Sequence, residues 1–385
     1  MSVTAAQGFT AAGIAAGIKA NGNPDLALVV NNGPRLAAAG VFTSNRVKAA
    51  PVLWSEQVLR GGAISAVVLN SGGANACTGP RGFQDTHATA EKVADVLGGA
   101  HNAGEIAVAS TGLIGVLLPM DKLLPGVETA AAALTEDGGE AAAIAIKTTD
   151  TVHKTATASQ DGWTVGGMAK GAGMLAPGLA TMLVVLTTDA DLDSATLDRA
   201  LRAATRTTFD RVDSDGCMST NDTVLLLASG ASGEVPAYED FAEAVRTVCD
   251  GLARQLIGDA EGASKDIRIE VVGALTEDDA VEVGRSIARN NLLKCAIHGE
   301  DPNWGRVLAA IGTTKASFDP DRLNVAINDV WVCKNGSVGE DRDLVSMKGR
   351  EVRITADLAN GSESAVIWGN DLTAEYVHEN SAYSS

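Results

Sequence analysis

KGAGMLAPGLATMLVVL, residues 170–186, joins an irregular segment to a regular one. Its first part is rich in glycine and proline, which predict a loop rather than a helix or strand. Its last six residues, 181–186, are mostly apolar and β-branched, and such a short run predicts a buried strand. Thr181 therefore lies where a loop enters a strand, a position at which its hydroxyl would be poorly shielded from a substrate.

A hydroxyl at position 181 needs help before it can act as a nucleophile. A threonine hydroxyl reacts poorly unless a base removes its proton, and the residue's own α-amine is one such base. That amine is free only at the start of a chain, so this chemistry requires a cut between Ala180 and Thr181. The small Ala180 and the preceding glycines would let the backbone bend for the cut. A plain loop that leads into a core strand explains the same residues.

The pattern of apolar residues along the rest of the chain predicts a fold of mixed helices and strands. This pattern does not distinguish the α/β class from the α+β class. Apolar residues recur at helical spacing after Asp193, which suits a helix N-cap. The strands expected from short apolar runs are 66–69, 105–109, 181–186, 223–228, 267–272, 323–327 and 352–356. The expected helices are 81–97, 193–205, 238–257 and 277–290.

Composition narrows the function classes. The 385 residues are 45% hydrophobic, enough to bury a large core in one domain or two. The formal net charge is −18, which argues against a nucleic-acid backbone or an anionic membrane as partner. No apolar run approaches the roughly 20 residues that cross a bilayer, and the N-terminus does not resemble a signal peptide.

Cysteine and histidine give no metal or disulfide pattern. The five cysteines are widely spaced without a CxxC pair, which is typical of reduced thiols in the cytoplasm. Cys217, in the polar run DSDGCMSTND, is a minor candidate for a catalytic thiol. The five histidines have no metal-ligand spacing, so no metal is expected.

Motifs along nearly the whole chain carry a family resemblance. In order they are TTDT at 148–151, GWTVGGMAKGAGM at 162–174, STNDT at 219–223, DAEGASK at 259–265 and DPNWGR at 301–306. With the central stretch, they resemble the ornithine acetyltransferase (glutamate N-acetyltransferase) family. The resemblance implies a layered α-β-β-α sandwich with a smaller C-terminal α/β domain, about residues 275–385. It also implies self-cleavage into an α chain, 1–180, and a β chain, 181–385.

The same resemblance assigns roles to individual residues. Thr181 becomes the N-terminal nucleophile, and Thr111 with Gly112, at a predicted strand end, forms the oxyanion hole. The residues expected to contact substrate are Thr148, Lys170, Thr181, Glu261, Asn380 and Ser385. The family more often ends in threonine, and Ser385 keeps the hydroxyl without the methyl group. Asn221, Asp222 and the motif at 301–306 are given no catalytic role.

The implied activity is transfer of acetyl from N-acetylornithine to glutamate through an acetyl-Thr181 ester, in ping-pong fashion. It serves arginine biosynthesis in the cytoplasm and needs no tightly bound cofactor, with acetyl-CoA a possible co-substrate. The family implies an assembly of two α and two β chains.

Two other functions stay open. One is an amidase or aminopeptidase that uses the same threonine with water as acceptor. The other is a nicotinamide-binding oxidoreductase, because residues 171–176 fit GxGxxA. That fingerprint needs a helix at this point, and Pro177 and Gly178 leave it little room.

Overall fold

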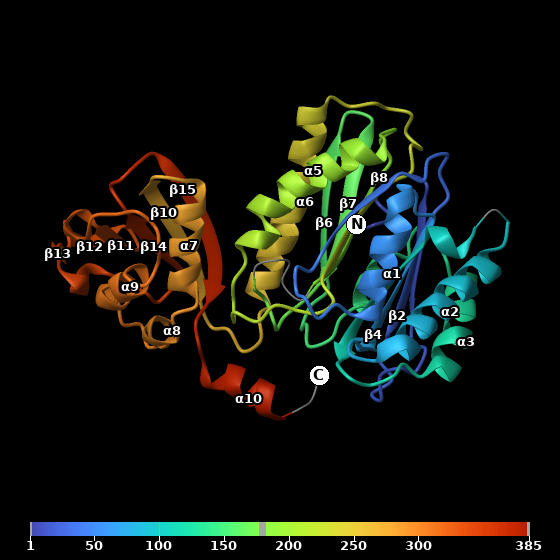
Figure 1. The fold of residues 1–385 in the computed structure, drawn as a ribbon, viewed down its shortest axis with the longest axis horizontal. Helices are drawn as coiled ribbons and strands as arrows, with labels where there is room; N and C mark the ends of the chain where they lie inside the picture. Colours follow the sequence, from blue (N-terminus) through green and yellow to red (C-terminus); the bar gives the residue numbers. More distant parts are fainter. Residues whose placement is uncertain (1, 100, 177–181, 383–385) are drawn as a thin grey trace.

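The computed structural model describes residues 2–99, 101–176 and 182–382 (Figure 1). The strands within these residues form three sheets. Their orders are β1-β2-β4-β5, β3-β9-β8-β7-β6 and β13-β12-β11-β14-β10-β15. The first two sheets stack on each other, and the third lies apart with its own helices (Figure 1).

The first sheet is covered by helices on its outer face. Its strands are β1 (Phe9–Ile14), β2 (Leu26–Asn31), β4 (Ala66–Gly73) and β5 (Ile106–Leu113). The covering helices are α1 (Ala50–Val58), α2 (Gly79–Leu97) and α3 (Met120–Ala132), and the short α4 (Gly139–Ala145) packs on β1 and β2. β4 and β5 are parallel, and their register shifts at Gly72 and Gly73. Both strands end at the cavity described below.

The second sheet faces the first and carries two long helices on its far side. Its strands are β3 (Ala38–Phe42), β6 (Lys154–Gln160), β7 (Trp163–Lys170), β8 (Leu183–Thr188) and β9 (Thr223–Ala228). The helices are α5 (Ser194–Thr207) and α6 (Tyr238–Gly258).

Alternate side chains of β8 show the layering. Leu183 and Val185 belong to the core shared with the first sheet, whereas Val184 and Leu186 belong to the core under α5 and α6. Alternation of this kind places one face of the strand against each layer. The predicted mixed α/β fold with an α-β-β-α sandwich is therefore confirmed.

The third sheet has a separate hydrophobic core. Its strands are β10 (Asp266–Ala274), β11 (Asn324–Ile327), β12 (Val330–Lys334), β13 (Ser337–Val338), β14 (Glu351–Asp357) and β15 (Glu363–Asn370). Its helices are α7 (Glu277–Ala288), α8 (Asn291–His298) and α9 (Trp304–Ile311). The smaller C-terminal domain was expected from about residue 275, but this sheet begins earlier, at Asp266 of β10. From this sheet α10 (Ala374–Ala382), drawn in red, leads the chain back toward the sandwich (Figure 1).

The elements expected from local pattern are present, with ends that differ by a few residues. Asp193 caps α5 as predicted, because its carboxylate accepts the Thr196 N–H at 2.8 Å. The strand expected at 181–186 is β8, which begins at Leu183. Position 181 lies outside the described residues, so the predicted loop-to-strand junction stays a prediction.

Candidate active site

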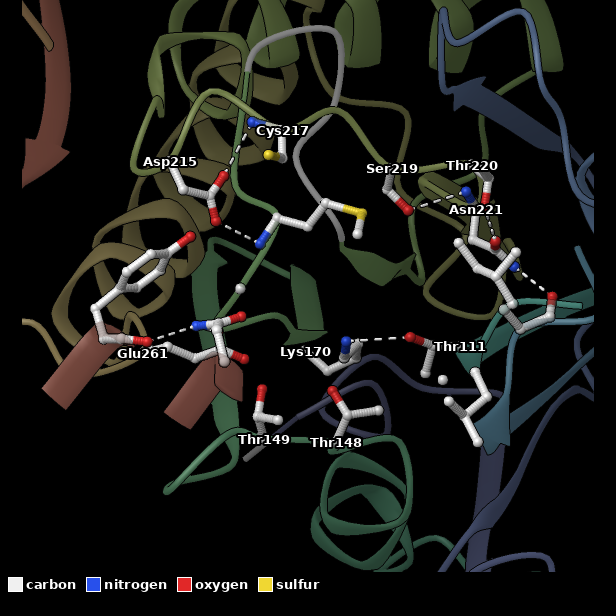
Figure 2. A pocket seen from close by; sticks show the side chains of 18 residues that line it. Thr111, Thr148, Thr149, Lys170, Asp215, Cys217, Ser219, Thr220, Asn221 and Glu261 are labelled. Carbon is white, nitrogen blue, oxygen red and sulfur yellow. Dashed lines mark hydrogen bonds between the residues drawn. The ribbon is translucent and has the colours of Figure 1, made fainter. Parts of the chain in front are cut away.

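A cavity of about 380 Å³ collects residues from distant parts of the chain (Figure 2). Six residues predicted for the site line it: Thr111, Gly112, Thr148, Lys170, Glu261 and Asn380. They come from β5, the segment after α4, the end of β7, the turn after α6, and α10. The other predicted positions, Ala180, Thr181 and Ser385, lie outside the described residues.

The end of β5 contributes a hydroxyl and a glycine. Gly112 has φ +126°, and a Cβ there would come within 2.6 Å of the Gly72 and Gly73 backbone, so no other residue fits without displacing β4. The neighbouring Thr111 hydroxyl accepts a hydrogen bond from Lys170 Nζ at 3.2 Å. A hydroxyl that accepts from an ammonium group directs its own proton elsewhere. Thr111 thus keeps a donor for a ligand.

Lys170 brings a buried positive charge to the cavity. Its side chain is 2% exposed, and burial lowers the pKa of the ammonium group, although the nearby Asp150 carboxylate opposes that shift. Burial alone would raise the pKa of Asp150, but Lys170 and Lys154 outweigh it and lower that pKa to about 2. Asp150 is therefore ionised at neutral pH.

Asp150 also fixes two pieces of backbone that border the cavity. Its Oδ2 accepts the Thr148 N–H at 2.9 Å, and its Oδ1 accepts the Gly171 N–H at 2.6 Å. Lys154 Nζ lies 2.6 Å from Asp150 Oδ1 and 2.5 Å from Asp259 Oδ2. This buried cluster joins the Thr148 segment, the start of the loop after β7 and the turn that contains Glu261.

The opposite side of the cavity is acidic (Figure 2). Asn380 Nδ2 donates to Glu261 Oε2 at 2.9 Å, which brings α10 against the turn after α6. The Glu261 N–H donates to the Ala172 carbonyl at 3.0 Å. A Cβ on Gly173 would come within 2.5 Å of the Glu261 carboxylate, so the glycine lets that group lie against the loop. The tail residue and the loop therefore meet at Glu261.

Sequence reasoning missed Asp215, a second acidic residue of the cavity. Its oxygens accept the Met174 N–H at 2.6 Å and the Cys217 N–H at 3.0 Å. Burial raises the pKa of Asp215, and burial together with Asp215 raises the pKa of the Cys217 thiol. A raised pKa leaves little thiolate at neutral pH, which argues against Cys217 as a nucleophile. The polar run at 213–222 was the only local signal for Asp215.

Two further kinds of site were compared with the described residues: a metal site and a dinucleotide site. No group of three or more His, Cys, Asp or Glu side chains in the described ranges is arranged to hold a metal ion. Residues 171–176 form no helix, so the GxGxxA pattern lacks the helix N-terminus that would meet a pyrophosphate. The helices of residues 2–99, 101–176 and 182–382 include none suited to cross a membrane.

The fold and cavity together define an α-β-β-α sandwich enzyme with a polar site for a small molecule. Thr111 lies at one side of that site, and Asp215 and Glu261 lie at the other, with Lys170 between them (Figure 2). The ArgJ family model matches residues 10–385. The chain belongs to the ArgJ family, and the resemblance predicted from the motifs is confirmed.

Individual relatives are similar along the whole chain. The arginine biosynthesis bifunctional protein ArgJ of Streptomyces avermitilis is 84% identical over 385 residues, which cover 100% of both chains. The protein of the same name from Thermobifida fusca is 63% identical over the same length and coverage.

Two solved structures match about half of the chain. Ornithine acetyltransferase from Mycobacterium tuberculosis, complexed with ornithine, is 61% identical across 47% of this chain and 96% of its own, with a TM-score of 0.45. ArgJ from Bacillus halodurans is 35% identical across 51% of this chain and 97% of its own, with a TM-score of 0.49.

Proposed function

We propose that this chain transfers an acetyl group from N-acetylornithine to glutamate, through an acetyl ester on Thr181. The observation that carries the proposal is the convergence of Thr111, Gly112, Thr148, Lys170, Glu261 and Asn380 on one cavity. The names of the relatives support it, since they are arginine biosynthesis proteins and one structure holds ornithine.

The charges of the cavity suit an amino acid. The buried Lys170 ammonium, which already interacts with Asp150, can also pair with an α-carboxylate of a ligand. Glu261 and Asp215 offer carboxylates at the opposite side, where a cationic side chain such as that of ornithine would be stabilised. Thr148 and Asn380 add neutral polar contacts that do not depend on the sign of the ligand.

The chemistry begins with cleavage between Ala180 and Thr181, which frees the Thr181 α-amine. That amine takes the hydroxyl proton as Thr181 Oγ attacks the acetyl carbonyl. The Thr111 hydroxyl and the Gly112 N–H stabilise the negative oxygen that develops. The C–N bond breaks, the α-amine of ornithine leaves with the proton, and an acetyl ester remains.

The second half-reaction reverses the first with another amine. The α-amine of glutamate attacks the ester carbonyl, the same two donors stabilise the oxyanion, and Thr181 regains its proton. N-acetylglutamate is released, and the enzyme returns to its starting state. Acetyl-CoA could acetylate the same threonine, which would account for the word bifunctional in the names of the relatives. Operation in the cytoplasm as two α and two β chains completes the proposal.

Mass spectrometry of the purified protein tests the cut and the ester together. We expect two fragments that correspond to residues 1–180 and 181–385, and the second should gain one acetyl group when N-acetylornithine is added alone. Thr181→Ala should give one uncut chain that gains no acetyl group. An uncut chain with full transferase activity would rule out the mechanism.

Labelled acetyl separates the transferase from an amidase. With N-acetylornithine that carries isotope in its acetyl group, we expect the label in N-acetylglutamate when glutamate is present. Label that appears in acetate at the same rate with or without glutamate would instead support the hydrolase with water as acceptor. Acetyl-CoA labelled in the same way tests the second donor.

A further inference from the structure

Asn221 lines the cavity but bonds to backbone rather than pointing a free donor into it (Figure 2). Its side chain comes from the STNDT motif just before β9, and the residue is 4% exposed. Nδ2 donates to the Ala74 carbonyl at 2.6 Å and to the Ser110 carbonyl at 2.8 Å. Oδ1 accepts from the Thr220 hydroxyl at 2.5 Å.

These three bonds decide what Asn221 can do. Two carbonyls lie at one end of the amide and a hydroxyl at the other, so the nitrogen must face the carbonyls. An amide nitrogen carries only two hydrogens, and both are used. Asn221 therefore has no donor left for a substrate oxygen, and it acts on the site through the groups that it holds.

The Ser110 carbonyl is the link to the reacting atoms. It shares one rigid peptide plane with the Thr111 N–H, so a bond to that oxygen fixes the orientation of the plane that leads into Thr111. The strand ladder gives weaker control here, because the β4–β5 register shifts at Gly72 and Gly73, opposite the end of β5. The Ala74 N–H bonds to the Leu113 carbonyl at 2.9 Å, so Asn221 bridges a closed loop of contacts around residues 111–113.

Asp222, the neighbour of Asn221, bonds to backbone next to the predicted nucleophile. Asp222 is fully buried, and its Oδ1 accepts the Met182 N–H at 3.0 Å. Met182 follows Thr181 in the chain. Asn221 thus holds the backbone just before the predicted oxyanion hole, and Asp222 holds the backbone just after the predicted nucleophile.

We propose that Asn221 is a positioning residue that aligns Thr111 and Gly112 with the acyl carbonyl, by clamping the Ser110 and Ala74 carbonyls to the start of β9. The proposal rests on the proposed function. It predicts a defect in turnover rather than in binding, because the clamp holds the backbone next to the oxyanion donors and has no donor left for the substrate.

Asn221→Ala is the main test, with both half-reactions measured on the cleaved fraction. Acetylation by N-acetylornithine and deacetylation by glutamate pass through the same oxyanion hole, so both rates should fall by a similar factor. A misplacement of about 1 Å costs on the order of 100-fold, and we expect a loss of about that size. KM for both substrates should stay within about threefold, since transition-state contacts affect kcat more than KM.

Ser55→Ala is the matched control. It removes two buried hydrogen bonds between Ser55 Oγ and the Val108 backbone, 2.7 and 2.9 Å long, which lie on β5 but away from the cavity. The control should lower the melting temperature while kcat stays near wild type. If Asn221→Ala does not fold, Asn221→Ser keeps one donor and should show a smaller loss of both rates.

The outcomes separate the two proposals. A wild-type protein that forms no acetyl-enzyme would overturn the proposed function itself. If wild type turns over and Asn221→Ala retains its kcat despite a lower melting temperature, Asn221 is merely structural. A rise in KM at unchanged kcat would make Asn221 a substrate contact and would also overturn the proposal.

Discussion

Lys154→Met tests whether the buried charge cluster beneath the cavity holds the site together. The Lys154 side chain is fully buried, and its Nζ lies within 2.6 Å of both Asp150 Oδ1 and Asp259 Oδ2. Methionine has a similar length but no charge, so it leaves two carboxylates without their common partner. Asp150 would keep the compensating charges of Lys170 and Lys19 and the hydrogen bond from the Gly171 N–H.

The expected loss follows from the burial of the cluster. Removing one partner of a buried ion pair typically costs about 3–5 kcal/mol, because the other charge remains buried and unpaired. The unfolding entropy is about 2.1 cal/mol/K per residue, or about 0.8 kcal/mol/K for a chain of this length. The melting temperature should therefore fall by about 4–6 °C at pH 7.

The loss of stability in Lys154→Met should depend on pH, and the pKa of Asp150 gives the direction. The pKa of Asp150 in the folded protein is about 2, below the value near 3.9 of an unfolded chain. The ionised Asp150 therefore stabilises the fold above about pH 4, and this contribution is lost as the pH falls from about 4 to about 2. Without Lys154 the pKa of Asp150 rises, so the variant has less of this contribution to lose. The difference in melting temperature should shrink at low pH.

Thermal unfolding followed by circular dichroism at pH 7 and near pH 3 measures both effects. The control is Lys334→Met, which breaks an exposed pair with Glu340, where the side chains are 50% and 45% exposed. Exposed pairs contribute about 0–1 kcal/mol, so the control should change little. A melting temperature of Lys154→Met that falls no more than that of the control would refute the role of the cluster. An equal fall at both pH values would refute the role of the Asp150 charge.

Three further predictions concern the site and its support. Thr111→Val should lower turnover by about 100- to 1,000-fold with little change in KM, and steady-state kinetics with unchanged turnover would contradict its role as donor. Deleting residues 380–385 should leave folding and self-cleavage intact but reduce acetyl transfer, because Glu261 loses its hydrogen bond with Asn380. A wild-type rate and KM would show that the tail does not contribute to the site. Burial raises the pKa of Asp213 from 3.8 to about 6, so the folded state holds this proton more tightly. As the pH rises from 4 to 6, the contribution of protonated Asp213 to the free energy of unfolding therefore falls by about 3 kcal/mol. Denaturant titrations of Asp213→Asn over this pH range should not show that fall.

Local pattern predicted some of the strands that are buried on both faces, such as β8 and β9, but it missed β2, which is buried at every position. β8 and β9 are continuous apolar runs because one side packs on the first sheet and the other on α5 and α6. β7 escaped prediction because it contains Gly166 and Gly167. A Cβ on Gly166 would come within 2.3 Å of the Ser2 carbonyl, so the glycine reflects a close approach that no local pattern reveals.

The residues of the site also fall into those that the sequence predicted and those that it did not. Motif resemblance located Thr111, Lys170 and Glu261, whose segments then meet at one cavity. It did not locate Asp215 or the Lys154 cluster, because their roles depend on contacts between segments far apart in the chain. α10 was missed for a related reason: none of its residues is buried, so it has no apolar stripe to mark it. Its placement depends on contacts such as that of Asn380 with Glu261, 119 positions away.

The sheet order bears on what a cut before Thr181 would do. In the order β3-β9-β8-β7-β6, the strands β9 and β8 follow the cut, whereas β3, β7 and β6 precede it. β8 pairs with β7 from Leu183 opposite Lys170 to Thr188 opposite Val165, and β9 pairs with β3 over the whole of β3. Each proposed fragment thus supplies strands that the other needs as hydrogen-bonded neighbours, and unpaired strand edges in a sheet are costly. The two fragments should therefore copurify under native conditions and separate only in denaturant. Lys170 and Thr111 come from the first fragment and Glu261 and Asn380 from the second, so the cavity is complete only while they stay together.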